Sequence, residues 1–306
     1  MNIQKLLLRL YPRAWRERYE EEFLVVLAAH PFSFFEGIDI MRGAIDAHFH
    51  PSFGTTDLSW PEKMKQMLLT LRSSLLMIFC AYSGFIVVGM AFQKLTEAHE
   101  FAIAAHTYSV LGVSFDLVLI GAVTALLAAL IGGLPVVVDV VKGALARKRY
   151  SLLVLLATPI FALAFFISTT FFLEKLVSLK VSPSLILLSH GLFLTVFLGT
   201  AAVSTATVCC AVARSEIEAK RLRFAALPSL LLTLSMALML VAVLIWGLGL
   251  RSSVPQLFES NEGMFGTNTS GSWLKIVLMM AGATGLATFS LLRGFAARSV
   301  LSSSRS

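Results

Sequence analysis

Six long apolar segments constrain the fold of this chain more than any other feature. The chain has 306 residues, of which 57% are hydrophobic and 14% charged, whereas soluble domains carry roughly 25% charged residues. A spanning helix needs about 20 mostly apolar residues, and backbone groups in lipid cannot bond to water, so a helix is the expected form. We expect an all-α polytopic membrane protein with a six-transmembrane-helix bundle. Its spans would cover residues 73–92, 109–138, 151–172, 183–212, 224–250 and 273–292.

The basic residues predict the orientation of the spans. Of the 25 Lys and Arg residues, 20 lie in the four segments that six spans would leave on one side of the membrane. The positive-inside rule places that side, and with it both termini, in the cytoplasm. The net charge of +7 suits an anionic lipid surface and indicates no nucleic-acid partner. The 20 residues are Lys5, Arg9, Arg13, Arg16, Arg18, Arg42, Lys63, Lys65, Arg72, Lys142, Arg147, Lys148, Arg149, Arg214, Lys220, Arg221, Arg223, Arg293, Arg298 and Arg305.

The chain is expected to divide into a head, a membrane domain and a tail. Residues 1–58 would form a small cytoplasmic helical hairpin, residues 59–298 the six-helix domain, and residues 299–306 a cytoplasmic tail. Proline favours the first turn of a helix, so we expect the first head helix to start at Pro12 and to end before Pro31. A capping box at Ser33 and Glu36 would open the second head helix. A similar start signal at residues 59–62 predicts a third helix that continues into the first span.

The first head helix carries the residues that suggest a docking surface. Residues 10–23 read LYPRAWRERYEEEF, and apolar side chains recur there at helical spacing. A hairpin this small has little core of its own, so we expect it to lean on the membrane surface, on the inner loops or on a partner protein. The residues expected to dock that partner are Trp15, Arg16, Tyr19, Glu20 and Glu21.

Residues 10–23 resemble the N-terminal signature of a group of bacterial membrane proteins, L-Y-P-x-x-[WF]-R-x-R-Y-x-E-E. Residues 39–48, DIMRGAIDAH, resemble the second half of the same unit. In some of these proteins the unit precedes the permease part of an ABC exporter and is called a permease prefix domain; in others it precedes a few helices without an assigned activity. The resemblance covers about the first 50 residues and implies a bacterial inner-membrane location. Residues 73–306 carry no such resemblance, and no loop between spans has room for a large extracytoplasmic domain.

Two ionisable residues inside the spans suggest a polar path. Asp116 lies seven residues into the second span and His190 seven residues into the fourth. Since both spans would run inward, the two groups are expected at similar depth, about 10 Å below the outer surface. Ionisable groups inside a span are costly and usually face the bundle interior. A pair would suit a proton or substrate path; the alternative is that each residue bonds to a neighbouring group near the interface.

The cysteines and histidines indicate no metal or cofactor site. Three cysteines, Cys80, Cys209 and Cys210, do not make a disulfide framework, and we expect packed or lipid-facing thiols. His48 and His50 have the H-x-H spacing of some metal sites, but on a helix they would lie about 200° apart. We therefore expect no metal ligands and no cofactor.

Small residues, tryptophans and a proline predict how the spans pack. The stretches at residues 199–202 and 281–285 are rich in Gly, Ala and Thr and would permit close helix packing, within the chain or in a homo-oligomer. Trp246 and Trp273 fall at the predicted outer ends of two spans, as an aromatic belt requires. The sequence at residues 132–135, GGLP, is expected to end or kink the second span.

The leading functional hypothesis is a non-enzymatic accessory or regulatory subunit that docks a cytoplasmic or membrane protein through its head. The alternative is a small permease, or the membrane subunit of an exporter, with a polar path near Asp116 and His190. An intramembrane enzyme is a third class, for which the sequence shows no motif of catalytic residues. The lipid bilayer is the remaining expected partner.

Overall fold

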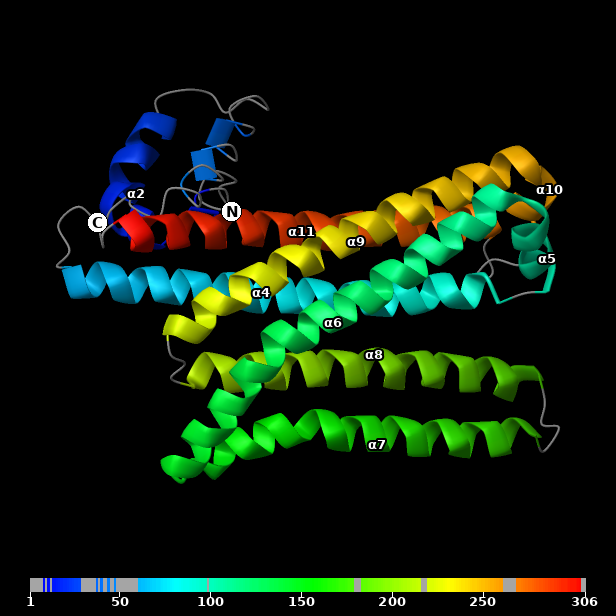
Figure 1. Ribbon diagram of the computed structural model, residues 1–306, viewed down its shortest axis with the longest axis horizontal. Coiled ribbons are helices and arrows are strands. Elements are labelled where there is room, and N and C mark those ends of the chain that lie inside the picture. Colours follow the sequence, from blue (N-terminus) through cyan, green and yellow to red (C-terminus); the bar gives the residue numbers. More distant parts are fainter. Residues whose placement is uncertain are drawn as a thin grey trace. The chain divides into compact units, whose positions relative to one another are not determined.

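The computed structural model describes residues 8, 10–11, 13–28, 37, 39–40, 43–44, 47, 60–97, 99–178, 183–215, 219–260 and 268–303. The secondary-structure elements among these residues are all α-helices (Figure 1), so the expected all-α class is confirmed. These helices are α2 (Arg13–Ala28), α4 (Trp60–Leu95), α5 (His99–Thr107), α6 (Ser109–Ala146), α7 (Tyr150–Ser178), α8 (Pro183–Arg214), α9 (Ala219–Ser253), α10 (Pro255–Phe258) and α11 (Thr269–Ser303).

Six of the described helices are long and apolar enough to cross a membrane, as in a multi-pass membrane protein. The apolar segments are Met67–Leu95, Ser109–Ala146, Tyr150–Leu173, Gly191–Arg214, Phe224–Ser253 and Thr269–Ala296. Each overlaps one of the six predicted spans, which are thereby confirmed as helices. Residues 132–135 do not end the second helix, because α6 continues through Pro135 to Ala146. The alternative that they kink this span stays a prediction.

The head helices begin close to their predicted start signals. Helix α2 begins at Arg13, and α4 begins at Trp60 and runs without interruption into the first span. The predicted capping box at Ser33 and Glu36 lies outside the described residues, as do His48 and His50.

The chain divides into two compact units, Met1–Ser74 with Phe289–Ser306, and Leu75–Thr288. In the larger unit, α6 and α9 pack against each other in antiparallel directions over much of their length. A Cβ added to Gly249 on α9 would lie 3.3 Å from Leu111 of α6, and one added to Gly132 on α6 would lie 2.8 Å from Pro228 of α9. Between these points, a Cβ added to Gly121 of α6 would lie 2.5 Å from the Cγ atom of Met239 on α9. This close contact is the main packing of the unit.

Small residues on α6, rather than those in the predicted stretches, allow this packing. Gly121, Ala125 and Ala128 are buried and recur on one face of α6. By contrast, a Cβ added to Gly199 on α8, or to Gly282 on α11, would meet nothing within 4 Å. The prediction of close intramolecular packing at residues 199–202 and 281–285 is therefore wrong for these glycines, and the oligomeric alternative for them stays a prediction.

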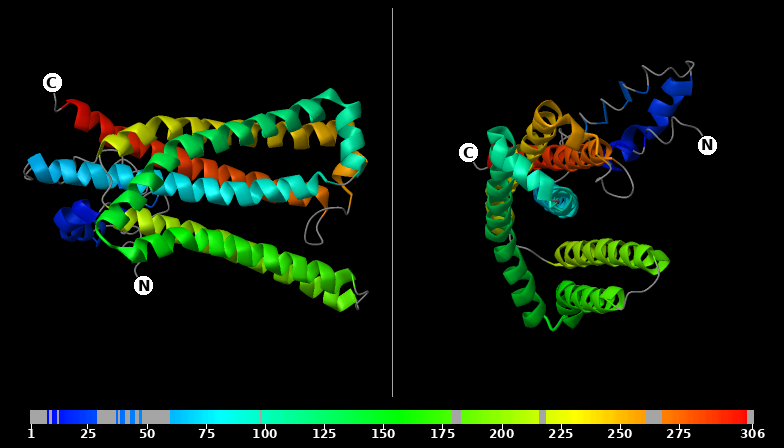
Figure 2. Two further views of the ribbon diagram at one scale, coloured as in Figure 1. Left: turned by 60° about the horizontal axis from the view of Figure 1, so that its bottom comes forward. Right: turned by 90° about the vertical axis from the view of Figure 1, so that its right-hand side faces the viewer.

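Helices α7 and α8 form an antiparallel hairpin and lie side by side in all views (Figures 1 and 2). Phe166 of α7 packs against Phe193 and Phe197 of α8, with ring centroids 5.6 and 5.7 Å apart. Only 6% of the most apolar stretch of α7 and 11% of that of α8 are buried, compared with 50% of the most apolar stretch of α9. The hairpin thus presents almost its whole apolar surface to its surroundings, as lipid-facing helices do.

Trp246 and Trp273 take part in packing between helices. Trp246 is 3% exposed, and its ring lies edge-on to Phe92 at 5.2 Å and against Phe101 at 5.8 Å. Trp273 donates a hydrogen bond from Nε1 to the carbonyl oxygen of Val243 at 3.0 Å. For Trp246 the prediction of an interfacial belt residue is wrong, because its indole is enclosed by aromatic neighbours rather than presented to headgroups.

Candidate functional site

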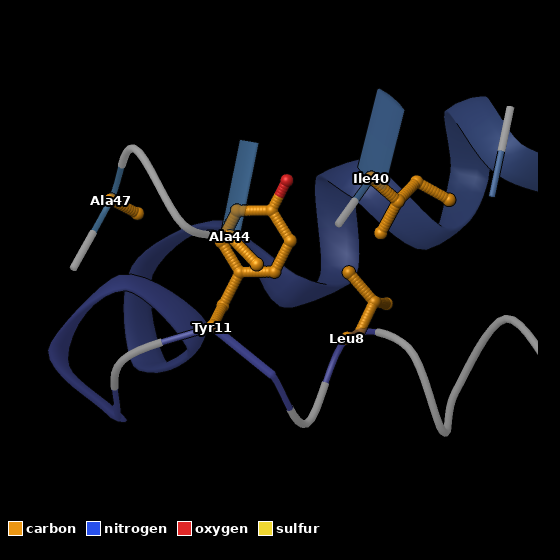
Figure 3. Close-up of a cluster of buried hydrophobic side chains, with 5 residues drawn as sticks. All are labelled: Leu8, Tyr11, Ile40, Ala44 and Ala47. Atoms are coloured by element: carbon orange, nitrogen blue, oxygen red, sulfur yellow. The ribbon is translucent and has the colours of Figure 1, made fainter. Parts of the chain in front are cut away.

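The head has a compact apolar core that fixes the start of α2. Leu8 and Tyr11 come from the segment before α2, and Ile40, Ala44 and Ala47 come from a second segment (Figure 3). All five side chains are buried, which stabilises the head by removing apolar area from water. Burial also raises the pKa of Tyr11 above its usual value, since the charged phenolate is poorly solvated there.

Aromatic side chains extend this core along one face of α2. The ring of Trp15 stacks on Tyr11 with centroids 4.0 Å apart and meets Phe23 edge-on at 5.5 Å. Tyr19 tilts against Trp15 at 5.4 Å. Trp15 and Phe23 are only partly buried, so one side of the aromatic row packs on the core and the other is accessible. Aromatic pairs of this kind hold their geometry, which gives the head a preformed surface.

A shallow groove of about 270 Å³ lies along this accessible side of α2, lined by Trp15, Tyr19, Glu22, Phe23 and Val26. We call it the α2 groove. Val26 is 59% exposed at one end of it. An apolar groove on a helix outside the six spans is a typical binding surface for an amphipathic segment.

Charged residues lie on the same helix as the α2 groove, and Glu22 lines it. Glu21 and Glu22 are exposed and Glu20 is half-buried. The Nε atom of Arg16 is buried and has no hydrogen-bond partner in the part of the chain that the structure describes. The surface around the groove therefore combines apolar contact with acidic side chains, and one guanidinium nitrogen still lacks an acceptor. Of the predicted docking residues, Trp15 and Tyr19 line the groove, whereas Arg16, Glu20 and Glu21 do not.

The predicted polar path at Asp116 and His190 has less structural support than the predicted docking surface on α2. Asp116 is exposed on α6. His190 belongs to α8, but its side chain lies outside those described. Whether the two groups meet stays a prediction.

Most hydroxyl groups in the spans bond within their own helix. Thr124 donates to the carbonyl oxygen of Ile120 at 2.8 Å, and Thr195 to that of Gly191 at 2.8 Å. Ser and Thr in helices commonly satisfy their hydroxyls in this way. Thr158, Ser168, Thr169, Thr170, Thr205, Thr207, Ser229, Thr233, Ser235 and Thr288 do the same. Polar side chains in the spans therefore do not by themselves indicate a path.

Two contacts between helices were not predicted from the sequence. The Sγ atoms of Cys80 on α4 and Cys209 on α8 lie 3.3 Å apart. Asp139 on α6 and Arg221 on α9 form an ion pair, with Nε and Oδ2 3.2 Å apart, although the contact lacks the alignment of a hydrogen bond. Residue spacing gave no signal for either pair, because each joins helices that are far apart in the sequence.

Comparison of this chain with known protein families, curated proteins and solved structures found no match.

Proposed function

We propose that this chain is a non-enzymatic accessory subunit of a bacterial inner-membrane assembly, and that the α2 groove docks its partner protein. The observation that carries the proposal is a preformed apolar groove on a helix outside the six spans. A partner that covers these apolar side chains would remove them from water, which favours binding. Both the charge pattern and the resemblance of residues 10–23 to a permease prefix unit support a cytoplasmic, bacterial setting.

The partner segment that fits the groove is amphipathic and basic. An apolar face would cover Trp15, Phe23 and Val26, while Lys or Arg side chains would meet the acidic residues Glu21 and Glu22. Glu22 lines the groove and would repel an anionic lipid headgroup placed in it, because like charges repel. A protein segment is therefore favoured over the membrane as the occupant.

The permease alternative has no observation in its favour among the described residues. Asp116 does not line the apolar cavity that the structure describes between the membrane helices. A permease would require a water-accessible cavity that reaches this carboxylate.

Co-purification of the full-length, tagged chain from native membranes tests the proposal. Val26 lines the groove, whereas its neighbour Val25 is 71% exposed and does not. We expect Val26→Glu to reduce recovery of the partner by about tenfold, which corresponds to about 1.4 kcal/mol of binding free energy. The matched variant Val25→Glu should retain the partner.

If the wild type, Val26→Glu and Val25→Glu all recover the same proteins in equal amounts, docking through the groove is refuted. Loss of an associated protein in an Asp116→Asn variant, together with its retention in Val26→Glu, would instead favour the permease alternative.

A further inference from the structure

Four helices of the Leu75–Thr288 unit enclose a second apolar cavity, of about 270 Å³. Its base is formed by buried side chains, among them Phe85, Phe92, Met239 and Met280. Its open side carries exposed apolar side chains, among them Ile86 and Met90. Tyr82 and Gln93 are the polar residues of the lining. The remaining lining residues are Gly89, Phe115, Val118, Leu119 and Ala122.

The cavity has the length of one lipid acyl chain. Its lining on α4 runs from Tyr82 to Gln93, which are eleven helical steps or roughly 16 Å apart along the helix. One leaflet of the hydrocarbon core is roughly 15 Å thick. A Cβ added to Gly89, midway along this stretch, would meet nothing within 4 Å, so open space continues past this glycine. An extended hydrocarbon chain parallel to α4 fits this shape.

Charged side chains of both signs follow two lining residues of the cavity, Gln93 and Phe115, in the sequence. Gln93 is the last lining residue on α4, and Lys94 follows it and pairs with Glu97; the two side chains are 70% and 64% exposed. On α6, the exposed Asp116 follows the lining residue Phe115. A phosphate would pair with the ammonium group of Lys94, and an amine would pair with the carboxylates of Glu97 and Asp116. This mixture of charges suits a zwitterionic headgroup better than an anionic one.

We propose that this cavity binds one acyl chain of a phospholipid with a zwitterionic amine headgroup, the headgroup lying at Lys94, Glu97 and Asp116. The site is separate from the α2 groove and does not depend on the proposed docking function. It gives Asp116 a role in lipid recognition that requires no contact with His190.

Lipid retention by the purified full-length protein tests the proposal. The wild-type chain is purified in mild detergent, delipidated on a column, and supplied with equal amounts of phosphatidylethanolamine and phosphatidylglycerol of the same chain length. Bound lipid is then counted by native mass spectrometry. We expect one retained phosphatidylethanolamine per chain; a wild-type chain that retains no lipid, or retains both in the proportion supplied, overturns the proposal.

Substitutions that fill the cavity test where the lipid acyl chain binds. Gly89→Phe and Ala122→Phe introduce a ring from two different helices and should each lower retention by about tenfold, or about 1.4 kcal/mol of binding free energy. Gly133→Phe is the matched control, because a Cβ at Gly133 also meets nothing within 4 Å while this residue does not line the cavity. A monodisperse elution profile is required of each variant. Equal retention in the filled and control variants would contradict the assignment of the site.

Substitutions that remove charge distinguish recognition of the lipid headgroup from binding of the acyl chain. Glu97→Gln with Asp116→Asn should reduce the preference for phosphatidylethanolamine over phosphatidylglycerol while an acyl chain remains bound. An unchanged preference would overturn the headgroup assignment.

Discussion

Replacing Gly247 with alanine is expected to destabilise the membrane domain, although alanine is the better helix former. Gly247 of α9 lies against Trp273 of α11, and a Cβ at this position would overlap the indole ring. The ring cannot turn aside freely, because its Nε1 donates a hydrogen bond to the carbonyl oxygen of Val243 at 3.0 Å and it packs edge to face with the ring of Phe258, with centroids 5.7 Å apart.

The size of the effect follows from three contributions. Overpacking a close contact costs about 1–3 kcal/mol, and loss of the indole hydrogen bond costs about 1 kcal/mol. Alanine recovers about 1 kcal/mol of helix propensity relative to glycine. The net loss is therefore about 1–3 kcal/mol, or roughly a tenfold to hundredfold shift in the unfolding equilibrium.

The assay is the fraction of protein that stays monodisperse on size exclusion after heating in detergent. Gly282→Ala on α11 is the control, because a Cβ there meets nothing within 4 Å, and it should leave the midpoint unchanged or raise it slightly. If Gly247→Ala is as stable as wild type, or if both variants shift alike, the inferred contact with Trp273 is refuted.

Three further predictions concern the other contacts. Oxidation of membranes with copper phenanthroline should join Cys80 to Cys209, because their Sγ atoms at 3.3 Å need to approach by only about 1.3 Å; peptide mass spectrometry detects the bond, and its absence would contradict the approach of α4 to α8. A double-mutant cycle with Asp139→Asn and Arg221→Gln should give a favourable coupling of about 0.2–1 kcal/mol, since the guanidinium is half exposed; a zero or repulsive coupling in thermal midpoints would contradict the pair. Because burial raises the pKa of Tyr11, its contribution to head stability is present below about pH 10 and is lost as the pH rises through the folded-state pKa. Tryptophan fluorescence should show this loss, and Tyr11→Phe should remove it; an identical pH profile in the variant would refute the assignment.

The sequence was sufficient to predict the helices but not their partners. Apolar length predicted six spans, and the start signal near Trp60 predicted where α4 begins. Which face of each span is buried could not be predicted, because spans that are apolar on all sides have no polar face to mark the outside. The buried face of α6, with Gly121, Ala125 and Ala128, was therefore missed in favour of small residues elsewhere.

Of the two candidate sites, the α2 groove could be predicted in part from the sequence and the acyl-chain cavity could not. Trp15 and Tyr19 were predicted in the head because an amphipathic helix outside the spans shows its apolar face in the residue spacing, and both line the α2 groove. The acyl-chain cavity was not predicted, because it depends on which four helices come together. Its lining residues, such as Gly89 and Met280, are ordinary span residues when considered one at a time.

Site-specific photocross-linking in living cells tests the docking claim most directly. A photoreactive phenylalanine at Val26 should produce one cross-linked protein partner, whereas the same group at Val25 should produce little or none. The account predicts that a single partner is captured at position 26. It also predicts that this partner no longer co-purifies with the Val26→Glu variant. Equal cross-linking at both positions, or cross-linking to lipid alone at Val26, would contradict a protein-docking function for the α2 groove.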